Sequence, residues 1–443
     1  MSRTDEPKAK RHEPMSRKKK IIIAAVCLIA AAAVIAAVTG LRRRAEDADF
    51  GTARNVSGDY TFVLLGRDAH ITRYGGYAER LTVPAALNGH PVTSVSDRAF
   101  AGCASLRAVE LPEGVTSLGN YAFAGCENLE EAALPASLSA FGANPFAGCP
   151  RLAVFRVPAE GAAGASGGAL YTKADMCLIA LCEGADPSRA AVPDGIRGIG
   201  TAAFRDRAAL ADLALPDGLT AIGDEAFRGC AALTELTLPD SLAEIGISAF
   251  DGCVSLNRVT MPRGLKKIGA SAFRGCTALT AAGLPEGLSE IGAAAFRGCT
   301  ALRSVTLPAG LTALGNEAFY GCSALEAAVL PASLPAVGDD AFRGCTSLTA
   351  LRVPGTVRVG SGAFDGCTAL AELEIAEGTL TLDSLSFAYC RALARASLPA
   401  SITHIAPDAF AGCGALTVSA PDGSYAAAWA EEHGLAGRGG SDE

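Results

Sequence analysis

Histidine, tryptophan and methionine are scarce in this sequence of 443 residues, which contains five, one and four of them respectively. The histidines are scattered and form no group with cysteine at the spacings typical of zinc sites. We therefore expect no metal centre. Aromatic residues make up only 6% of the chain, so an aromatic side chain that recurs at a fixed interval is informative.

The short motifs of common catalytic sites are also missing. The chain contains no G-x-S-x-G, no H-E-x-x-H and no Walker-type phosphate loop. Gly198 to Ala203 imitates the glycine pattern of dinucleotide-binding loops, but no helix of useful length is expected after it. We expect neither a cofactor nor an enzyme. The net charge of −8 argues against a general affinity for nucleic acid.

What the sequence has in abundance is repetition. Phenylalanine recurs at intervals of 23 residues, apart from one interval of 22 before Phe364 and one of 58 before Phe204. Such a period predicts stacked supersecondary units. The repeated phenylalanines are Phe100, Phe123, Phe146, Phe204, Phe227, Phe250, Phe273, Phe296, Phe319, Phe342, Phe364, Phe387 and Phe410.

Each unit follows the pattern L-x-x-I-G-x-x-A-F-x-G-C-x-x-L-x-x-L-x-L-P. Leu236 and Leu238 alternate with polar residues, which predicts a short strand with one apolar face that ends at Pro239. A unit buries about five large apolar side chains at roughly 2 kcal/mol each, whereas ordering its backbone costs about 1–2 kcal/mol per residue. A single unit should not fold, but stacked units share a continuous core.

Two further features of the unit predict local structure. The glycine after the isoleucine, such as Gly246, predicts a turn that requires positive φ. The A-F-x-G-C stretch is too short for a full helix and predicts a single helical or 3₁₀ turn.

This frame resembles the BspA-like leucine-rich repeat of bacterial and some protozoan surface proteins, over roughly Tyr60 to Leu435. The resemblance implies a β-rich α/β solenoid with leucine-rich repeats of about 23 residues. It also implies a non-catalytic module that binds proteins or adheres to host proteins, matrix or other cells. A structural scaffold or assembly partner in the cell envelope is the alternative, because fold analogy is weak evidence for function.

The N-terminal region predicts attachment to a membrane. Residues 1–20 are basic and suggest a cytoplasmic tail, and residues 21–41 carry no charge over a length sufficient for a transmembrane signal-anchor helix. Residues 42–58 then form a linker, which would leave the repeats outside the cell. Cleavage of residues 21–41 as a signal peptide, which would give a secreted protein, is the alternative.

The remaining segments follow from the repeat frame. We expect an N-terminal β cap at 59–98, repeats at 99–158 and 196–420, and a capping helix with a tail at 421–443. The interruption at 159–195 combines a glycine- and alanine-rich loop with a hairpin. Arg207 stands at the cysteine position of the first repeat after it.

Twelve of the fifteen cysteines lie three residues after a repeat phenylalanine. We interpret them as a ladder of small buried thiols. Neighbouring units about 5 Å apart would also satisfy the Cα distance for disulfides, although parallel Cβ vectors make the required torsion awkward. Both interpretations stay open from the sequence.

The residue after each phenylalanine varies, and in register it should form one stripe with a spacing of about 5 Å. Arginine forks and a tyrosine in such a stripe suit an anionic glycan or a protein partner, whereas a solvated edge is the simpler interpretation. The polar positions of the strand face show no comparable pattern. The candidate ligand-binding residues are Arg205, Arg228, Arg274, Arg297, Tyr320 and Arg343.

Overall fold

The computed structural model describes residues 54–182, 186–355 and 357–436. The chain divides into one unit that ends at Arg54 and a second, described below, that begins at Asn55. The expected basic tail, the hydrophobic segment 21–41 and most of the linker therefore lie outside the described residues. In the part of the chain that is described, no helix has both the length and the apolar character needed to cross a bilayer.

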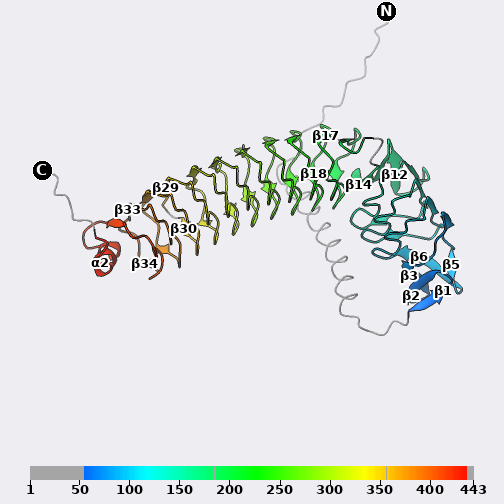
Figure 1. Ribbon diagram of the computed structural model, residues 1–443, viewed down its shortest axis with the longest axis horizontal. Helices are drawn as coiled ribbons and strands as arrows, with labels where there is room; N and C mark the ends of the chain where they lie inside the picture. Colours follow the sequence, from blue (N-terminus) through cyan, green and yellow to red (C-terminus); the bar gives the residue numbers. More distant parts are fainter. Residues whose placement is uncertain (1–53, 183–185, 356, 437–443) are drawn as a thin grey trace, which may run out of the picture. The chain divides into compact units, whose positions relative to one another are not determined.

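Successive repeats form successive turns of a β-solenoid, and each turn contributes two short strands to two separate parallel sheets (Figure 1). Equivalent positions pair from turn to turn: Ile222 opposes Ile245, and Ile245 opposes Ile268. The 23-residue period of the sequence thus determines which residues pair between neighbouring strands of the sheet.

The strands that precede the insertion lie in two sheets. One contains β1 (Asn55–Ser57), β2 (Tyr60–Leu65), β3 (Asp68–Tyr74), β5 (Ala86–Leu87), β6 (His90–Val95), β8 (Ser117–Leu118) and β10 (Ala140–Phe141). The other contains β4 (Arg80–Thr82), β7 (Ala108–Glu110), β9 (Glu131–Ala133) and β11 (Val154–Arg156).

The insertion and the following turns begin a new set of sheets. The hairpin strands pair antiparallel, and the last of them then pairs in parallel with the first resumed turn. This sheet contains β12 (Ala163–Ser166), β13 (Ala169–Thr172), β14 (Cys177–Leu181), β16 (Gly198–Ile199), β18 (Ala221–Ile222), β20 (Glu244–Ile245), β22 (Lys267–Ile268), β24 (Glu290–Ile291) and β26 (Ala313–Leu314), and it is followed by β28 (Ala336–Val337), β30 (Arg358–Val359), β32 (Thr381–Leu382) and β34 (His404–Ile405).

The second strand of each later turn builds the opposite sheet. It contains β19 (Glu235–Thr237), β21 (Arg258–Thr260), β23 (Ala281–Ala282), β25 (Ser304–Thr306), β27 (Ala327–Val329), β29 (Ala350–Val353), β31 (Glu372–Ile375), β33 (Arg395–Ser397) and β35 (Thr417–Ser419), and β15 (Arg189–Ala191) pairs with β17 (Asp212–Ala214) beside the insertion.

The repeat phenylalanines stack on one another in the core. Phe250, Phe273 and Phe296 are fully buried, and their neighbouring ring centroids lie 5.2 and 5.3 Å apart with planes nearly parallel. The stack is interrupted once, because Phe146 packs edge-on against Phe155 and a second column begins at Phe204. The column predicted from the period is therefore present as two columns separated by the insertion.

All the described cysteines are free thiols. Of the two interpretations that the sequence left open, buried thiols and disulfides, the first is therefore correct for these residues. Each internal thiol donates a hydrogen bond to the carbonyl of the phenylalanine in the preceding turn, as Cys276 Sγ does to Phe250 O at 3.3 Å. Burial raises the pKa of Cys322 to about 12, so this thiol is neutral.

The role predicted for the repeat glycine was wrong. Gly246 and its equivalents do not adopt positive φ; a Cβ on Gly246 would lie 2.6 Å from the carbonyl carbon of Gly223 in the preceding turn. Close approach of neighbouring backbones therefore selects glycine here. Positive φ occurs instead at Gly252 of the F-x-G-C stretch and at Ser248, two residues before the phenylalanine.

The helical part of the predicted α/β class also needs correction. The A-F-x-G-C stretches are turns, and the only α-helix among the described residues is α2 (Tyr425–Glu432). Ser424 caps this helix by accepting a hydrogen bond from Ala427 N at 3.1 Å. Trp429 of α2 packs on Phe410, which covers the end of the second column. The fold is a β-solenoid.

Candidate functional site: the arginine–tyrosine stripe

The residues that follow the phenylalanines lie in register. The amide of Gly252 donates to Arg274 O, that of Gly275 to Arg297 O and that of Gly298 to Tyr320 O, each at 2.8 Å. These bonds fix the same position of consecutive turns side by side. We call this row the stripe; it consists of Arg205, Arg228, Asp251, Arg274, Arg297, Tyr320, Arg343 and Asp365.

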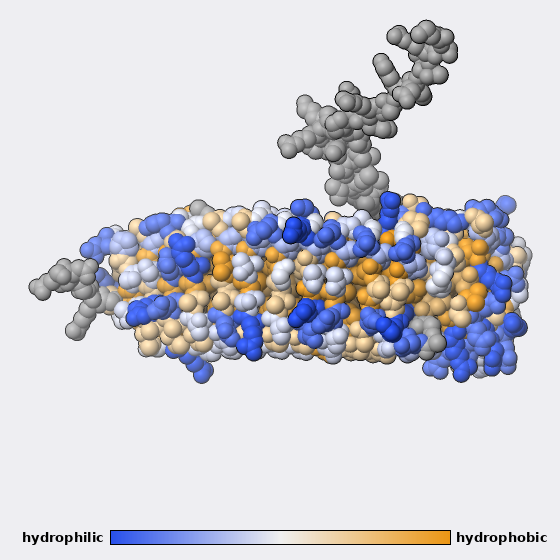
Figure 2. Space-filling view, turned by 90° about the horizontal axis from the view of Figure 1, so that it is seen from above, coloured by the Kyte–Doolittle hydropathy of each residue, from blue (hydrophilic) through white to orange (hydrophobic). Residues whose placement is uncertain are grey.

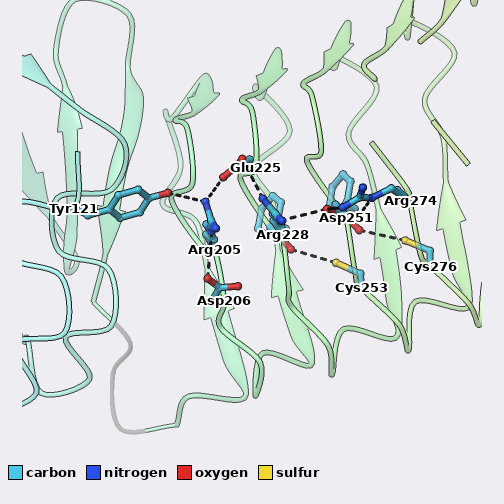
Figure 3. Close-up of polar contacts among 11 residues, drawn as sticks. Tyr121, Arg205, Asp206, Glu225, Arg228, Asp251, Cys253, Arg274 and Cys276 are labelled. Carbon is cyan, nitrogen blue, oxygen red and sulfur yellow. Dashed lines mark hydrogen bonds and ion pairs between the residues drawn. The ribbon is translucent and has the colours of Figure 1, made fainter. Parts of the chain in front are cut away.

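Asp251 joins the arginines on either side of it (Figure 3). Its side chain is only 8% exposed and accepts two bonds from Arg274, from Nε and from Nη2, both at 2.9 Å. Arg228 Nε lies 3.3 Å from the same carboxylate. The hydrogen bonds that Arg274 donates to Asp251, together with the negative charge of that carboxylate, raise the pKa of Arg274.

Asp365 is a second shielded carboxylate further along the stripe, and it pairs with one arginine of the stripe. Its carboxylate is also 8% exposed and lies 3.1 Å from Arg343 Nε. Burial raises the pKa of Asp365, and the charge of Arg343 opposes this rise.

A second row of acidic side chains runs beside the stripe, two residues before the phenylalanines. Glu225 pairs with Arg205 and with Arg228, and the latter separation is 3.3 Å. Glu317 pairs with Arg297, and Asp340 lies 3.3 Å from Arg343. Each arginine predicted to bind a ligand is therefore already paired with a carboxylate.

Tyr320 lies between two guanidinium groups. The Arg297 group is 4.5 Å from the centre of its ring, and the Arg343 group is 5.9 Å from it. Both distances suit cation–π contacts. The side chains of Arg274, Arg297 and Arg343 are nevertheless 48%, 44% and 45% exposed, so they remain accessible to a partner.

The arginines at the N-terminal end of the stripe, Arg205 and Arg228, are less exposed than the other arginines of the stripe. Arg205 is only 28% exposed, and its Nη1 donates to the hydroxyl of Tyr121 at 3.1 Å, across the interruption between the two phenylalanine columns (Figure 3). The structure thus aligns the predicted residues but separates a shielded end, at Arg205 and Arg228, from an open part, at Arg274 to Arg343.

Sequence reasoning missed the acidic row and Tyr121. The acidic partners could have been found from their spacing in the sequence. Glu225 precedes Arg228 by three residues in the same turn, and Glu317 lies three residues before the stripe position of the turn that follows Arg297. Tyr121 carries no such signal, since its contact with Arg205 spans the insertion, whose path cannot be read from a repeat.

A second exposed face belongs to the outward side chains of β19 to β35. Figure 2 views the side on which β29 and β33 are labelled in Figure 1, and apolar residues run along the middle of this face with hydrophilic residues at both margins. Arg352 and Glu374 of this sheet pair across neighbouring turns at 2.9 Å. Among the described residues, no group of histidine, cysteine and carboxylate side chains could hold a metal ion.

The model of the BspA type leucine rich repeat region matches residues 85–163, 197–326 and 312–424, in six copies. The chain belongs to the BspA-type leucine-rich repeat family. The resemblance noted in the sequence is thereby confirmed.

Solved structures of bacterial leucine-rich repeat proteins are similar to this chain. A leucine-rich repeat protein from Bacteroides ovatus is 23% identical, with 83% of this chain and 100% of that chain covered and a TM-score of 0.51. A leucine rich cell surface protein from Faecalibacterium prausnitzii is 22% identical, with 89% and 100% covered and a TM-score of 0.37. The first likeness supports the solenoid fold. No curated protein matches the chain.

Proposed function

We propose that this BspA-type protein is a non-catalytic binding module that recognises a protein partner through the open part of the stripe. The observation that supports the proposal is the row of three half-exposed arginines, Arg274, Arg297 and Arg343. The last two of them lie against the ring of Tyr320. Arginine and tyrosine are, together with tryptophan, the residue types enriched at the energetic centres of protein interfaces.

The ion pairs favour a protein over an anionic glycan. The carboxylates of Asp251, Glu317 and Asp340 balance the charges of the open arginines. A polyanion would bring these carboxylates close to its own charges, and this repulsion offsets its attraction to arginine. A protein surface that carries both signs can instead add hydrogen bonds to guanidinium groups that are already oriented.

Orientation also lowers the cost of binding. Arg297 is held by Glu317 on one side and by the Tyr320 ring on the other. An arginine held in this way loses less side-chain entropy when a partner binds, and ordering a free side chain costs about 0.5–1.5 kcal/mol. The stripe thus offers a preformed contact surface.

Display at the cell surface and adhesion form the wider part of the proposal. BspA-type repeats are typical of surface proteins, and the basic residues 1–20 followed by the uncharged residues 21–41 suit an anchor that keeps the repeats outside. Protease treatment of intact cells tests this: loss of the repeats supports display, whereas their protection favours the scaffold role in the envelope.

The binding proposal is tested by neutralising the open part of the stripe. A variant with Arg274→Gln, Arg297→Gln and Arg343→Gln is compared with a control in which Arg258→Gln, Arg352→Gln and Arg395→Gln change the strand face. Both are applied to arrays of cell-surface proteins, matrix proteins and sulfated glycans. Partners of the unaltered chain should be lost by the stripe variant and kept by the control.

Three results would contradict the proposal. Unchanged protein binding by the stripe variant would remove the stripe from the interface. Loss of binding only in the control would move the interface to the strand face. Binding confined to sulfated glycans would show that the ion pairs do not screen the arginines as argued. Circular dichroism of each variant separates these results from loss of the fold.

A further inference from the structure

The interruption between the two phenylalanine columns encloses a cavity. Phe146 ends the first column: its ring stacks on Phe123 with planes 6° apart, and it also meets Phe155, whose ring is tilted by 67° with centroids 5.2 Å apart. Phe204 begins the second column without a ring stacked on its near side in the described part of the chain. A cavity of about 420 Å³ lies here, within the size range of ligand pockets.

Part of the cavity lining is apolar, and we call this part the floor. The residue types found there explain why the space is open. Ala124 and Ala147 line it, and each directly follows a repeat phenylalanine. The turns from Phe204 to Phe364 place arginine, aspartate or tyrosine at this position, so alanine leaves room here that these turns fill. Phe155 and Leu181 complete the apolar lining.

Three arginines and one carboxylate lie at the mouth of the cavity, and the carboxylate, Asp206, is 3.2 Å from Arg205 Nε. Arg98 and Arg205 lie on the Tyr121 ring, with guanidinium carbons 5.6 and 5.8 Å from its centre. Arg207 lies over the Phe204 ring at 5.1 Å and donates to the carbonyl of Leu181. No carboxylate of the described residues lies within ion-pair distance of Arg98, unlike the arginines of the stripe.

One buried polar atom at the cavity is unpartnered. The side chain of Asn144 is 5% exposed, and its Nδ2 donates to Ala202 O at 3.1 Å and to Ala203 O at 3.0 Å. Its Oδ1 accepts no hydrogen bond from any described residue. These two donated bonds fix the orientation of the amide, and a buried acceptor without a donor costs about 1–3 kcal/mol. A ligand with an N–H or O–H group can relieve this cost.

We propose that this cavity binds a carboxylate attached to an apolar body, either as a free organic acid or as the C-terminal residue of a peptide. The apolar body lies against Phe155 and Leu181, and the carboxylate meets Arg98 at the mouth. A peptide also offers its amide N–H to Asn144 Oδ1. The site is separate from the open part of the stripe and does not depend on the proposed function.

Isothermal titration calorimetry on the full chain tests the proposal with three probes. These are 3-phenylpropionate, N-acetyl-Gly-Gly-Phe with a free carboxylate, and the same peptide with a C-terminal amide. We expect a Kd below about 1 mM for at least one carboxylate probe and binding at least about tenfold weaker for the amide, because a charge-assisted hydrogen bond is lost. The two carboxylate probes distinguish a free acid from a peptide terminus.

Variants locate the binding. Ala147→Tyr fills the floor with a side chain that the same repeat position carries at Tyr320, so the turn can accommodate it, and it should abolish binding. Arg98→Gln should weaken carboxylate binding about tenfold without altering the floor. The matched controls Ala411→Tyr and Arg258→Gln change equivalent residue types away from the cavity and should bind as the unaltered chain does.

Each other outcome overturns the proposal. Absence of heat with both carboxylate probes at about 5 mM excludes the ligand class. Binding that survives Ala147→Tyr places the probe elsewhere. Equal affinity for the acid and the amide, or an unaffected Arg98→Gln variant, removes the carboxylate from the recognition. If Ala147→Tyr alters the circular dichroism spectrum, Arg98→Gln decides the question alone.

Discussion

Truncation of a central phenylalanine should destabilise the solenoid far more than truncation of an exposed residue of the same region. Phe296 is fully buried, and its ring lies 5.3 Å from Phe273 and 5.2 Å from Phe319, nearly parallel to both. Phe296→Ala removes the ring from between two neighbours that belong to two other turns. The loss therefore weakens two interfaces at once.

The magnitude follows from the burial and the two stacks. Phenylalanine to alanine in a core costs about 3–5 kcal/mol, which includes the remaining cavity. Each stacked pair adds about 0.5–1.5 kcal/mol beyond burial. The turns on both sides are held in place by their own hydrogen bonds, so the cavity left by the ring cannot close. We therefore expect the free energy of unfolding to fall by an amount near the upper value, about 5 kcal/mol.

Urea denaturation followed by circular dichroism measures this change. Val329→Ala is the control, because Val329 lies on a strand near the same turns but is 56% exposed; it should cost less than about 0.5 kcal/mol. A loss below about 1 kcal/mol for Phe296→Ala, or equal effects of the two variants, would refute the reasoning. The single tryptophan, Trp429, reports separately on the last turn by fluorescence.

Three further outcomes follow from the structure. Gly269→Ala should cost about 1–3 kcal/mol in urea denaturation, because its Cβ would lie 2.6 Å from the backbone of the preceding turn, whereas Gly283→Ala, with open space around it, should cost under about 1 kcal/mol; equal effects would contradict the close-approach argument. Stability should be retained below about pH 9 and fall toward pH 12, since burial raises the pKa of thiols such as Cys322 to about 12 while the unfolded thiol ionises near 9; a melting temperature that stays constant over this range would contradict it. Asp251→Ala should lower the free energy of unfolding by about 1.5–3 kcal/mol by removing the shared partner of two arginines, and a neutral result would show that water replaces it at no cost.

The repeat could be predicted from the sequence because every turn buries the same residue types at the same positions. Buried Phe273, Leu279 and Cys276 follow directly from their spacing, since only one register places them all inside. The register of the strands required no more information than the 23-residue period.

The local backbone was harder to predict. Glycine permits both positive φ and the close approach of two backbone segments, and the residue type alone does not show which of these a position requires. Gly246 proved to serve the second, while Ser248 adopts positive φ without being glycine. Only the position of the neighbouring turn reveals the difference.

The candidate site shows the same limit. Register aligned Arg274, Arg297 and Tyr320, so the row itself was predictable. The spacing also places carboxylates such as Glu317 beside the row, but whether Arg297 pairs with Glu317 or faces solvent depends on side-chain direction, which the sequence does not give. The junction cavity was least predictable, since it arises where the insertion breaks the period.

Hydrogen exchange of the backbone amides in Phe296→Ala tests most directly whether neighbouring turns complete one another. The amides of Phe273 and Phe319 each donate to the next turn at 2.7 Å, so both report on the altered region. We expect protection to fall most in these turns and to recover with distance toward Phe227 and Phe387. Equal loss of protection across the whole array, or no loss beside the altered residue, would contradict the account.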